Sequence, residues 1–523
     1  MPQADVLVIG SGIAGISAAI EAAREGASVT IASVGPFASG SSFHPATWGL
    51  GLIGPENPDD VDDLVSSILH VGRGVADPDL VRTLVEGIDD AVRWLEELGI
   101  ELKRPKNAES ALEREFIPCF DTKRRLWRGL VREALKSGMG REVDRLGIGI
   151  EEGVELVDLV QDGRDRIVGA VLHDLAHGEL TFWTAGSVVL ATGGTGGLFA
   201  RSLSPNDVLG SAHGIALAHG CRLVNIEFMQ MMPGLVWPRE GVVFNEKTFR
   251  HVSLLDENPI LGTLSDDGLK EVLEQRSGHG PFTASLDDHV IDLAIDASGP
   301  SGLPLRYDLP PIGNRPEFVQ SFITWLETEH EISPDDEMRL AMYAHASNGG
   351  IAIDGNGRTG VAGLHACGEV TGGMHGADRI GGLSSANGLV FGRRAGRDAA
   401  RESSLVRSRD LDVDVMARAK ERIALGIDPL VARGALEELR RLMTEHCMIM
   451  RTESGLTRAR KGILSLRHRI GKSVIKDPRG SEAAALMRIS SQLGLAEAMI
   501  DAMTARTKGL GAHFRADEPG AQG

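Results

Sequence analysis

The feature that most constrains this chain is a glycine motif near its start, in ADVLVIGSGIAGISAAIEAAREGASVTIAS. The run Val6 to Ile9 is short and apolar, which is typical of a buried parallel strand. Gly10, Gly12 and Gly15 follow in G-x-G-x-x-G spacing and open an alanine-rich helix that runs to Gly26. The first glycine allows the turn, the second lets backbone approach a pyrophosphate, and the third lets helix pack on strand. The stretch therefore predicts a dinucleotide-binding unit with the phosphates at the helix N-terminus.

Two other positions bear on this prediction. The second strand ends in Ser33, where dinucleotide-binding units usually place an acidic residue on the ribose hydroxyls. A serine hydroxyl can do part of that work. Residues 188–197, VVLATGGTGG, again lead a strand into a glycine loop, which implies a second backbone approach to the same long ligand.

Composition narrows the class of protein. The chain has 523 residues, of which 42% are hydrophobic, so it can bury the cores of several domains. Its net charge of −18 disfavours nucleic acid and anionic membrane surfaces as partners. No apolar run reaches the roughly 18 residues of a membrane-spanning helix, and the first residues, MPQADVLVIG, lack a signal-peptide pattern.

The cysteines indicate a reducing compartment. The chain has four of them, without CxxC spacing: Cys119, Cys221, Cys367 and Cys447. We therefore expect neither a disulfide framework nor a metal site, and a cytoplasmic location.

The remaining pattern divides the chain into regions of different character. We expect amphipathic helices at 59–74 and 78–99, a small antiparallel sheet within 150–190, an inserted domain at 230–340, a strand, turn and strand at 351–373 with a helix after them, and a charged helical bundle after about residue 410.

Four stretches in this order resemble a known family. They are the glycine motif at 10–15, SGSSFHPATWGLG at 39–51, VVLATGGTGG with the residues that follow it to 230, and GLHACGEVTGGMHGADRIGG at 363–382. Together they resemble the flavoproteins that include succinate dehydrogenase, fumarate reductase and L-aspartate oxidase. The stretch MTEHCMIMRTESGLTRARKGI is similar to the C-terminal helical domain of these proteins, with L-aspartate oxidase nearest in pattern.

The resemblance implies an α/β fold with a Rossmann-like FAD-binding domain, an inserted α+β capping domain and a C-terminal helical domain. The FAD-binding domain would comprise residues 1–230 and 346–410, the cap 231–345, and the helical domain 411–523.

FAD would then extend along residues from both parts of its domain. The contacts expected from the resemblance are Gly10, Gly12, Ala14, Gly15, Ser33, Ser41, Ser42, Thr192, Gly193, Gly194, Glu369, Ser384, Ser385 and Leu389. Ser42 aligns with the histidine that membrane-bound relatives join covalently to FAD, so we expect noncovalent FAD.

The resemblance also implies a substrate carboxylate held by Arg379 and His345, with hydride moving between a substrate carbon and flavin N5. An arginine fork matches a carboxylate and keeps its charge when buried. The alternatives that the residues leave open are a surface arginine beside Asp378 and a core histidine with its hydrogen bonds satisfied.

Other parts of the family pattern are missing. In EFMQMMPGLVW, Gln230 is kept, but Met232 replaces a substrate-binding histidine of the relatives. We find no match at 235–265 to their segment with a substrate-contacting threonine and glutamate. The cap arginine of the relatives aligns with Asp292 or Leu293, and Arg276 and His279 are the nearest replacements.

Because methionine donates no hydrogen bond, one end of this pocket would be less polar than a site for succinate or aspartate. We therefore expect an FAD-dependent oxidoreductase acting on a small carboxylate. Two alternatives remain: an enzyme for a less polar monocarboxylate, and a flavoprotein subunit that serves an electron-transfer partner and has little activity alone. The electron acceptor is left open.

Overall fold

The computed structural model describes residues 1–46, 48–104, 119–121, 123, 125–255, 258–406 and 413–519. β1 (Gln3–Ile9) lies inside the largest sheet, as its apolar run predicts, and Val6 and Val8 are fully buried. The strand order is β5 (Gly149–Glu152), β2 (Val29–Ser33), β1, β8 (Leu180–Leu190), β7 (Ile167–Asp174) and β6 (Val154–Gln161), with β16 (Leu364–Ala366) also paired to β8. The pairs among β5, β2, β1, β8 and β16 are parallel, whereas β7 and β6 continue the sheet antiparallel.

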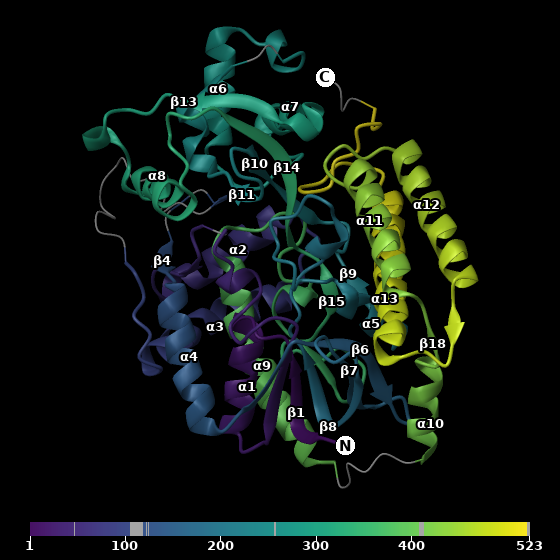
Figure 1. Ribbon diagram of the computed structural model, residues 1–523. Helices are drawn as coiled ribbons and strands as arrows, with labels where there is room; N and C mark the ends of the chain where they lie inside the picture. The colour runs from purple at the N-terminus through teal and green to yellow at the C-terminus, as the bar shows by residue number, and fades with distance from the viewer. Residues whose placement is uncertain are drawn as a thin grey trace.

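Two helices from opposite halves of the chain pack together beside this sheet (Figure 1). They are α1 (Ile13–Arg24), directly after the glycine motif, and α9 (Leu383–Ser404). A Cβ atom placed on Gly392 would lie 2.6 Å from the Ala14 carbonyl oxygen, and one on Gly396 would lie 2.1 Å from that of Ala18. Glycine on α9 thus permits the close approach that joins the two halves of this domain.

The same part of the molecule holds α2 (Val61–Val71), α3 (Pro78–Glu97), α4 (Arg132–Leu146) and the antiparallel pair β3 (Gly51–Gly54) and β4 (Leu126–Gly129). Both helices expected between residues 59 and 99 are present. The Asp77 side chain caps α3 by accepting hydrogen bonds from the backbone N–H of Asp79 and Leu80.

A second, five-stranded antiparallel sheet forms the part at the top of Figure 1. Its order is β11 (Val242–Val243), β10 (Met229–Trp237), β14 (Met338–Ser347), β13 (Leu303–Tyr307) and β12 (Val252–Leu254). It is accompanied by α6 (Asp266–Arg276), α7 (Val290–Ala297) and α8 (Glu317–His330). β10 leads into this cap and β14 leads out of it, and at the end of β14 the Ser347 N–H donates to Glu369 Oε1 at 2.9 Å.

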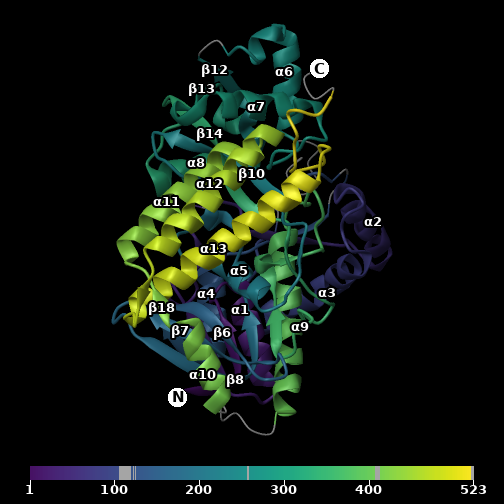
Figure 2. The same ribbon diagram turned by 90° about the vertical axis from the view of Figure 1, so that its right-hand side faces the viewer.

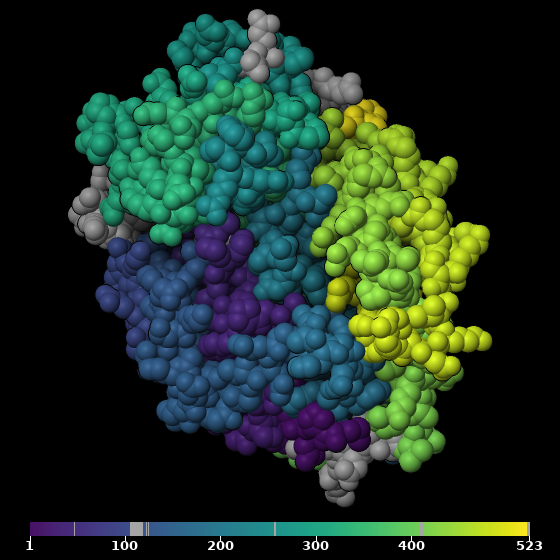
Figure 3. All heavy atoms as spheres, in the orientation of Figure 1, coloured from purple at the N-terminus to yellow at the C-terminus, as the bar shows by residue number. Residues whose placement is uncertain are grey.

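The C-terminal helices lie side by side along one flank in both ribbon views (Figures 1 and 2). They are α11 (Pro429–His446), α12 (Glu453–Lys472) and α13 (Gly480–Ala505), with a short pair β18 (Leu425–Gly426) and β19 (Ile475–Lys476). α10 (Val413–Arg422) lies apart from them, against β6. α13 packs on α5 (Ser211–Ala218), where a Cβ on Gly214 would lie 2.0 Å from the Ser491 carbonyl oxygen. The space-filling view shows the cap and these helices packed on the domain of the main sheet (Figure 3).

The strands expected within residues 351–373 are present, and their partners come from distant parts of the chain. β15 (Gly350–Ala352) pairs with β9 (Leu223–Val224) and β17 (Thr371–Gly372), while β16 joins the main sheet. The edge of β8 and the chain at β9 offer longer-range partners, which local turn chemistry does not reveal. In the described residues, no helix is both long and apolar enough to cross a bilayer.

Candidate functional site

A long cavity begins at the glycine motif and ends beneath the cap. Gly10 has a φ of +113°, and a Cβ there would lie 2.3 Å from the Ala191 carbonyl oxygen. A Cβ on Gly15 would lie 2.0 Å from the Gly10 carbonyl oxygen, so this glycine serves helix packing. A Cβ on Gly12 would meet nothing nearer than the Ser39 carbonyl oxygen at 3.9 Å, so its backbone faces open space. That space, at the N-terminus of α1, is suited to a pyrophosphate.

Most residues expected to hold FAD line this cavity. They are Gly10, Gly12, Ala14, Ser33, Ser41, Ser42, Thr192, Gly193, Glu369, Ser384 and Ser385. Gly15, Gly194 and Leu389 are not among the lining residues. A Cβ on Gly194 would lie 2.2 Å from Glu369 Oε1, so Gly194 makes room for that carboxylate, and Leu389 is fully buried behind Gly388.

Several polar atoms on the cavity wall lack a partner in the described part of the chain. Ser41 Oγ and Asp207 Oδ1 are buried in this way, while Asp207 Oδ2 accepts a hydrogen bond from the Gly40 N–H at 2.9 Å. Ser33 Oγ lies 2.8 Å from Ser11 Oγ. Buried polar atoms of this kind fit a polar ligand with hydroxyl groups, and the donor set fits FAD. Asp207 was not among the expected site residues, although it lies within the family-like stretch 188–230.

Arg379 lies at the far end of the cavity rather than on the surface. Its Nε and Nη2 donate to Gln230 Oε1 at 3.1 and 2.7 Å, and Gln230 is fully buried on β10. Burial lowers the pKa of Arg379, while Glu369 and Cys119 act in the opposite direction. Within the described ranges the guanidinium has no ion pair with a carboxylate.

His345 also lines the cavity, from β14. In the β10–β14 ladder, Gln230 is opposite Ala346 and Met231 is opposite Ala344, so His345 is the extra residue of a β-bulge. Bulges re-aim side chains and are frequent beside active sites. Burial, and then the charge of Arg379, lower the pKa of His345 to about 3, which keeps the imidazole neutral.

Met232, Cys119 and Glu246, around Gly280, form a further part of the cavity wall. A Cβ on Gly280 would lie 3.4 Å from Met232 Cε and 3.6 Å from both Cys119 Sγ and Glu246 Cδ. The Cys119 thiol donates to Glu246 Oε1 at 3.1 Å, and burial together with Glu246 raises its pKa to about 12. Glu246 lies in the stretch where no family segment was recognisable, and Cys119 carries no signal in sequence.

The side chains of Arg276 and His279, the expected replacements for the cap arginine, lie outside the cavity. Arg276 is fully buried in a two-bond pair with Asp292, from Nε and Nη2 at 2.9 Å each, and its Nη2 also donates to the Gly280 carbonyl oxygen. His279 contacts the Pro281 carbonyl and Asp288. Neither side chain lines the cavity, although the backbone of Gly280 and Pro281, which they hold, does so.

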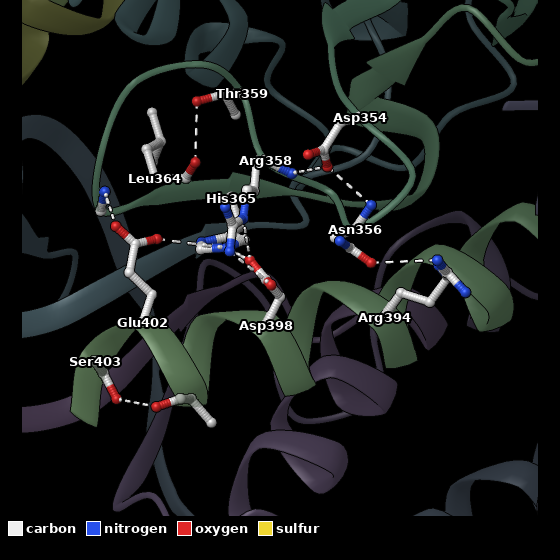
Figure 4. A network of polar contacts seen from close by, with 12 residues as sticks. Asp354, Asn356, Arg358, Thr359, Leu364, His365, Arg394, Asp398, Glu402 and Ser403 are labelled. Carbon is white, nitrogen blue, oxygen red and sulfur yellow. Dashed lines mark hydrogen bonds and ion pairs between the residues drawn. The ribbon is translucent and has the colours of Figure 1, made fainter. Parts of the chain in front are cut away.

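Another cluster of ligand-type side chains lies beside α9, outside the cavity (Figure 4). His365, Asp398 and Glu402 place ligand atoms within 4.8 Å of one another. Asp398, however, accepts from Arg358 Nε at 2.6 Å and from Nη2 at 2.9 Å, and Glu402 pairs with Arg166 at 2.6 Å. Since both carboxylates already have cationic partners, the cluster joins α9 to the loop before β16.

Comparison with known proteins agrees with this geometry. The FAD binding domain family matches residues 5–385, and the family described as fumarate reductase flavoprotein C-term matches residues 436–522. A fumarate reductase (CoM/CoB) subunit of Methanothermobacter marburgensis is 28% identical over 99% of this chain and 95% of that protein. L-aspartate oxidase of Streptomyces coelicolor is 27% identical over 98% of this chain and 88% of that protein.

Solved structures share the fold. Sdh1 of Mycobacterium smegmatis superposes with a TM-score of 0.79 at 23% identity, over 99% of this chain and 89% of that one. Quinol fumarate reductase of E. coli superposes with a TM-score of 0.78 at 23% identity, over 99% of this chain and 92% of that one. The chain therefore belongs to the FAD-dependent oxidoreductase family of fumarate reductase, succinate dehydrogenase and L-aspartate oxidase.

Proposed function

We propose that this enzyme oxidises or reduces a small carboxylate substrate whose carboxylate is anchored by Arg379. The observation that carries the proposal is a half-buried guanidinium on the cavity wall whose hydrogen-bond partner is the uncharged Gln230. Burying a cation without a counter-charge is costly, and a ligand carboxylate would supply that charge.

FAD would be held noncovalently along the glycine motif, Ser33, Glu369 and the start of α9, and when bound it supplies a two-electron carrier. Gln230 fixes the orientation of the Arg379 fork, so that the substrate carboxylate binds at one angle. The neutral imidazole of His345 adds a hydrogen bond without a second charge. Met232 donates no hydrogen bond and the Glu246 carboxylate lies near it, so this wall disfavours a second carboxylate close to the first.

The test is an anaerobic titration of the purified yellow protein with succinate, L-aspartate and a panel of monocarboxylates, followed by flavin absorbance. The reverse direction uses the reduced protein and fumarate. We expect at least one acid to change the flavin redox state. Arg379→Gln should lower the kcat/KM for that acid by about a hundredfold or more. Arg379→Lys should restore little of this activity, because the two-pronged guanidinium is lost. An acid that reacts equally well with both variants contradicts the proposal.

A second candidate is favoured by one relative, the Methanothermobacter protein, which is named as one subunit of its enzyme. In that case the chain would pass electrons to a separate electron-transfer subunit. FAD-loaded protein that reacts with no acid alone, yet co-purifies with an iron–sulfur protein and gains activity with it, would identify this function. Location in the cytoplasm stays a prediction.

A further inference from the structure

The cavity at Arg379 continues into a second one, between the cap helix α8 and the domain of the main sheet. Trp48, Cys119, Glu246 and Gly381 line both cavities. The Cys119–Glu246 pair therefore lies at the junction, with Arg379 on one side. A ligand that binds Arg379 has room to extend past this pair.

Lys247 lines the second cavity directly after Glu246. Lys247 is only 8% exposed. Its backbone N–H donates to Asn245 Oδ1 at 2.8 Å, which fixes the turn that carries Lys247. In the part of the chain that the structure describes, its ammonium has neither a hydrogen bond nor an ion pair. It is close enough to Cys119 that its charge opposes the rise in the pKa of that thiol, which burial and Glu246 cause. An unpaired ammonium on a cavity wall is suited to bind an anionic group of a ligand.

The cavity space between Arg379 and Lys247 is lined by apolar side chains on one side. Trp48 packs edge-to-face on Phe318 of α8, with ring centroids 4.4 Å apart, and Trp48 and Trp325 pack on the buried cluster that contains Met232. On the other side Glu246 faces the route with its carboxylate bonded to Cys119. A ligand there would carry no negative charge in its middle, because Glu246 would repel it. Further charged residues line the second cavity: the carboxylates Glu96, Glu101 and Glu317, and the cations Lys103, Arg104 and Arg132.

We propose that the substrate is an extended acid with two anionic ends: a carboxylate on Arg379, an apolar middle along Met232 and Trp48, and a second anionic group on Lys247. This inference rests on the proposed function and specifies its substrate. It also explains how an apolar wall at Met232 and a site for charged substrates can coexist, since the second charge lies beyond that wall.

The experiment measures dissociation constants from perturbation of the flavin spectrum in the FAD-loaded protein. The probes are the diacids succinate, glutarate, adipate, pimelate and suberate, the monoacids butanoate, hexanoate and octanoate, and an ω-phosphono acid matched to the best diacid. The last probe distinguishes a carboxylate from a phosphate-like group at Lys247. The proteins are wild type, Lys247→Gln, Lys247→Arg and, as a matched loss of one charge at an exposed site on α12, Lys472→Gln.

For the wild type we expect affinity to rise along the diacid series beyond succinate, and not along the monoacids by the same amount. Lys247→Gln should weaken the best diacid by about tenfold to a hundredfold, since a charge-assisted hydrogen bond is lost. Monoacid binding should not change, Lys247→Arg should retain most of the preference, and Lys472→Gln should behave as the wild type.

Two results overturn the inference in different ways. If diacids bind Lys247→Gln as tightly as the wild type, or if Lys247→Gln weakens monoacids and diacids equally, Lys247 binds no second anion while the proposed function stands. If no acid of either series perturbs the wild-type flavin, the carboxylate anchor itself is wrong and the inference fails with it.

Discussion

Asp378, next to Arg379, is a carboxyl group buried in the folded protein, and its burial changes its ionisation. It is 1% exposed, and its Oδ2 accepts a hydrogen bond from the Thr283 hydroxyl at 2.8 Å, which joins the cap to the loop that carries Arg379. Burial raises the pKa of Asp378 to about 7, against smaller opposing effects of Thr283 and Arg73. The folded protein thus keeps this carboxyl protonated at pH values where the unfolded chain has lost the proton.

This shift predicts a pH dependence of stability. Between about pH 4 and about pH 7 the folded state binds more protons at Asp378 than the unfolded state, so the free energy of unfolding should fall as pH rises. Asp378→Asn should remove this loss, which amounts to at most about 4 kcal/mol. Thermal unfolding at about pH 5 and about pH 8 checks it, with the exposed Asp335→Asn as control. Equal pH slopes for wild type and Asp378→Asn would show that Asp378 ionises normally.

At the level of elements, the contact of α9 with α1 determines whether the two distant halves of the FAD-binding domain can join. Gly392 and Gly396 face the α1 backbone so closely that no side chain fits. The sequence predicts a helix here but indicates no role for these glycines, because a glycine in a helix is locally a disadvantage. Their reason lies in the partner helix.

Gly396→Ala should therefore lower the free energy of unfolding by about 1–3 kcal/mol or more, because the new Cβ would meet the Ala18 carbonyl oxygen. Gly434→Ala on α11 is the matched control: a Cβ there meets nothing within 4 Å, so it should raise stability by about 0.5–1 kcal/mol. Denaturant unfolding measures both. Stabilisation of both variants would mean that α1 and α9 are farther apart than described.

At the scale of the whole molecule, the segment after α13 connects the three parts. The Ala284 N–H of the cap donates to the Gly511 carbonyl at 2.8 Å, and the Ala512 N–H donates to the Ala377 carbonyl at 3.2 Å. Phe514 is 6% exposed and packs on Phe282 of the cap at 6.1 Å between ring centroids. This segment thus fixes the cap close to the loop that carries Arg379.

Phe514→Ala should destabilise this junction by about 3–5 kcal/mol, the usual cost of removing a buried phenylalanine. We expect faster limited proteolysis within the cap while FAD absorbance is retained. Leu430→Ala, at a residue 70% exposed, should change stability by no more than about 0.5 kcal/mol. Proteolysis at the wild-type rate in Phe514→Ala would exclude a role of this segment in holding the cap.

The sequence by itself determined the FAD-binding part, because its signals are local. The Gly10 turn and the strand before it depend on residues a few positions apart, where backbone geometry and hydrogen bonding act directly. Arg379 became a candidate anchor through the family resemblance of residues 363–382. The sequence did not show whether Arg379 lies in a cavity.

Only the tertiary structure decided the substrate end. Gln230 meets Arg379 across 149 positions of sequence, His345 turns inward through a bulge, and Cys119, Glu246 and Lys247 meet at a junction between cap and main domain. It also showed Arg276, a sequence candidate for this site, paired with Asp292. Side-chain direction and long-range pairing depend on how distant segments pack together, and no local pattern of residue types encodes that packing.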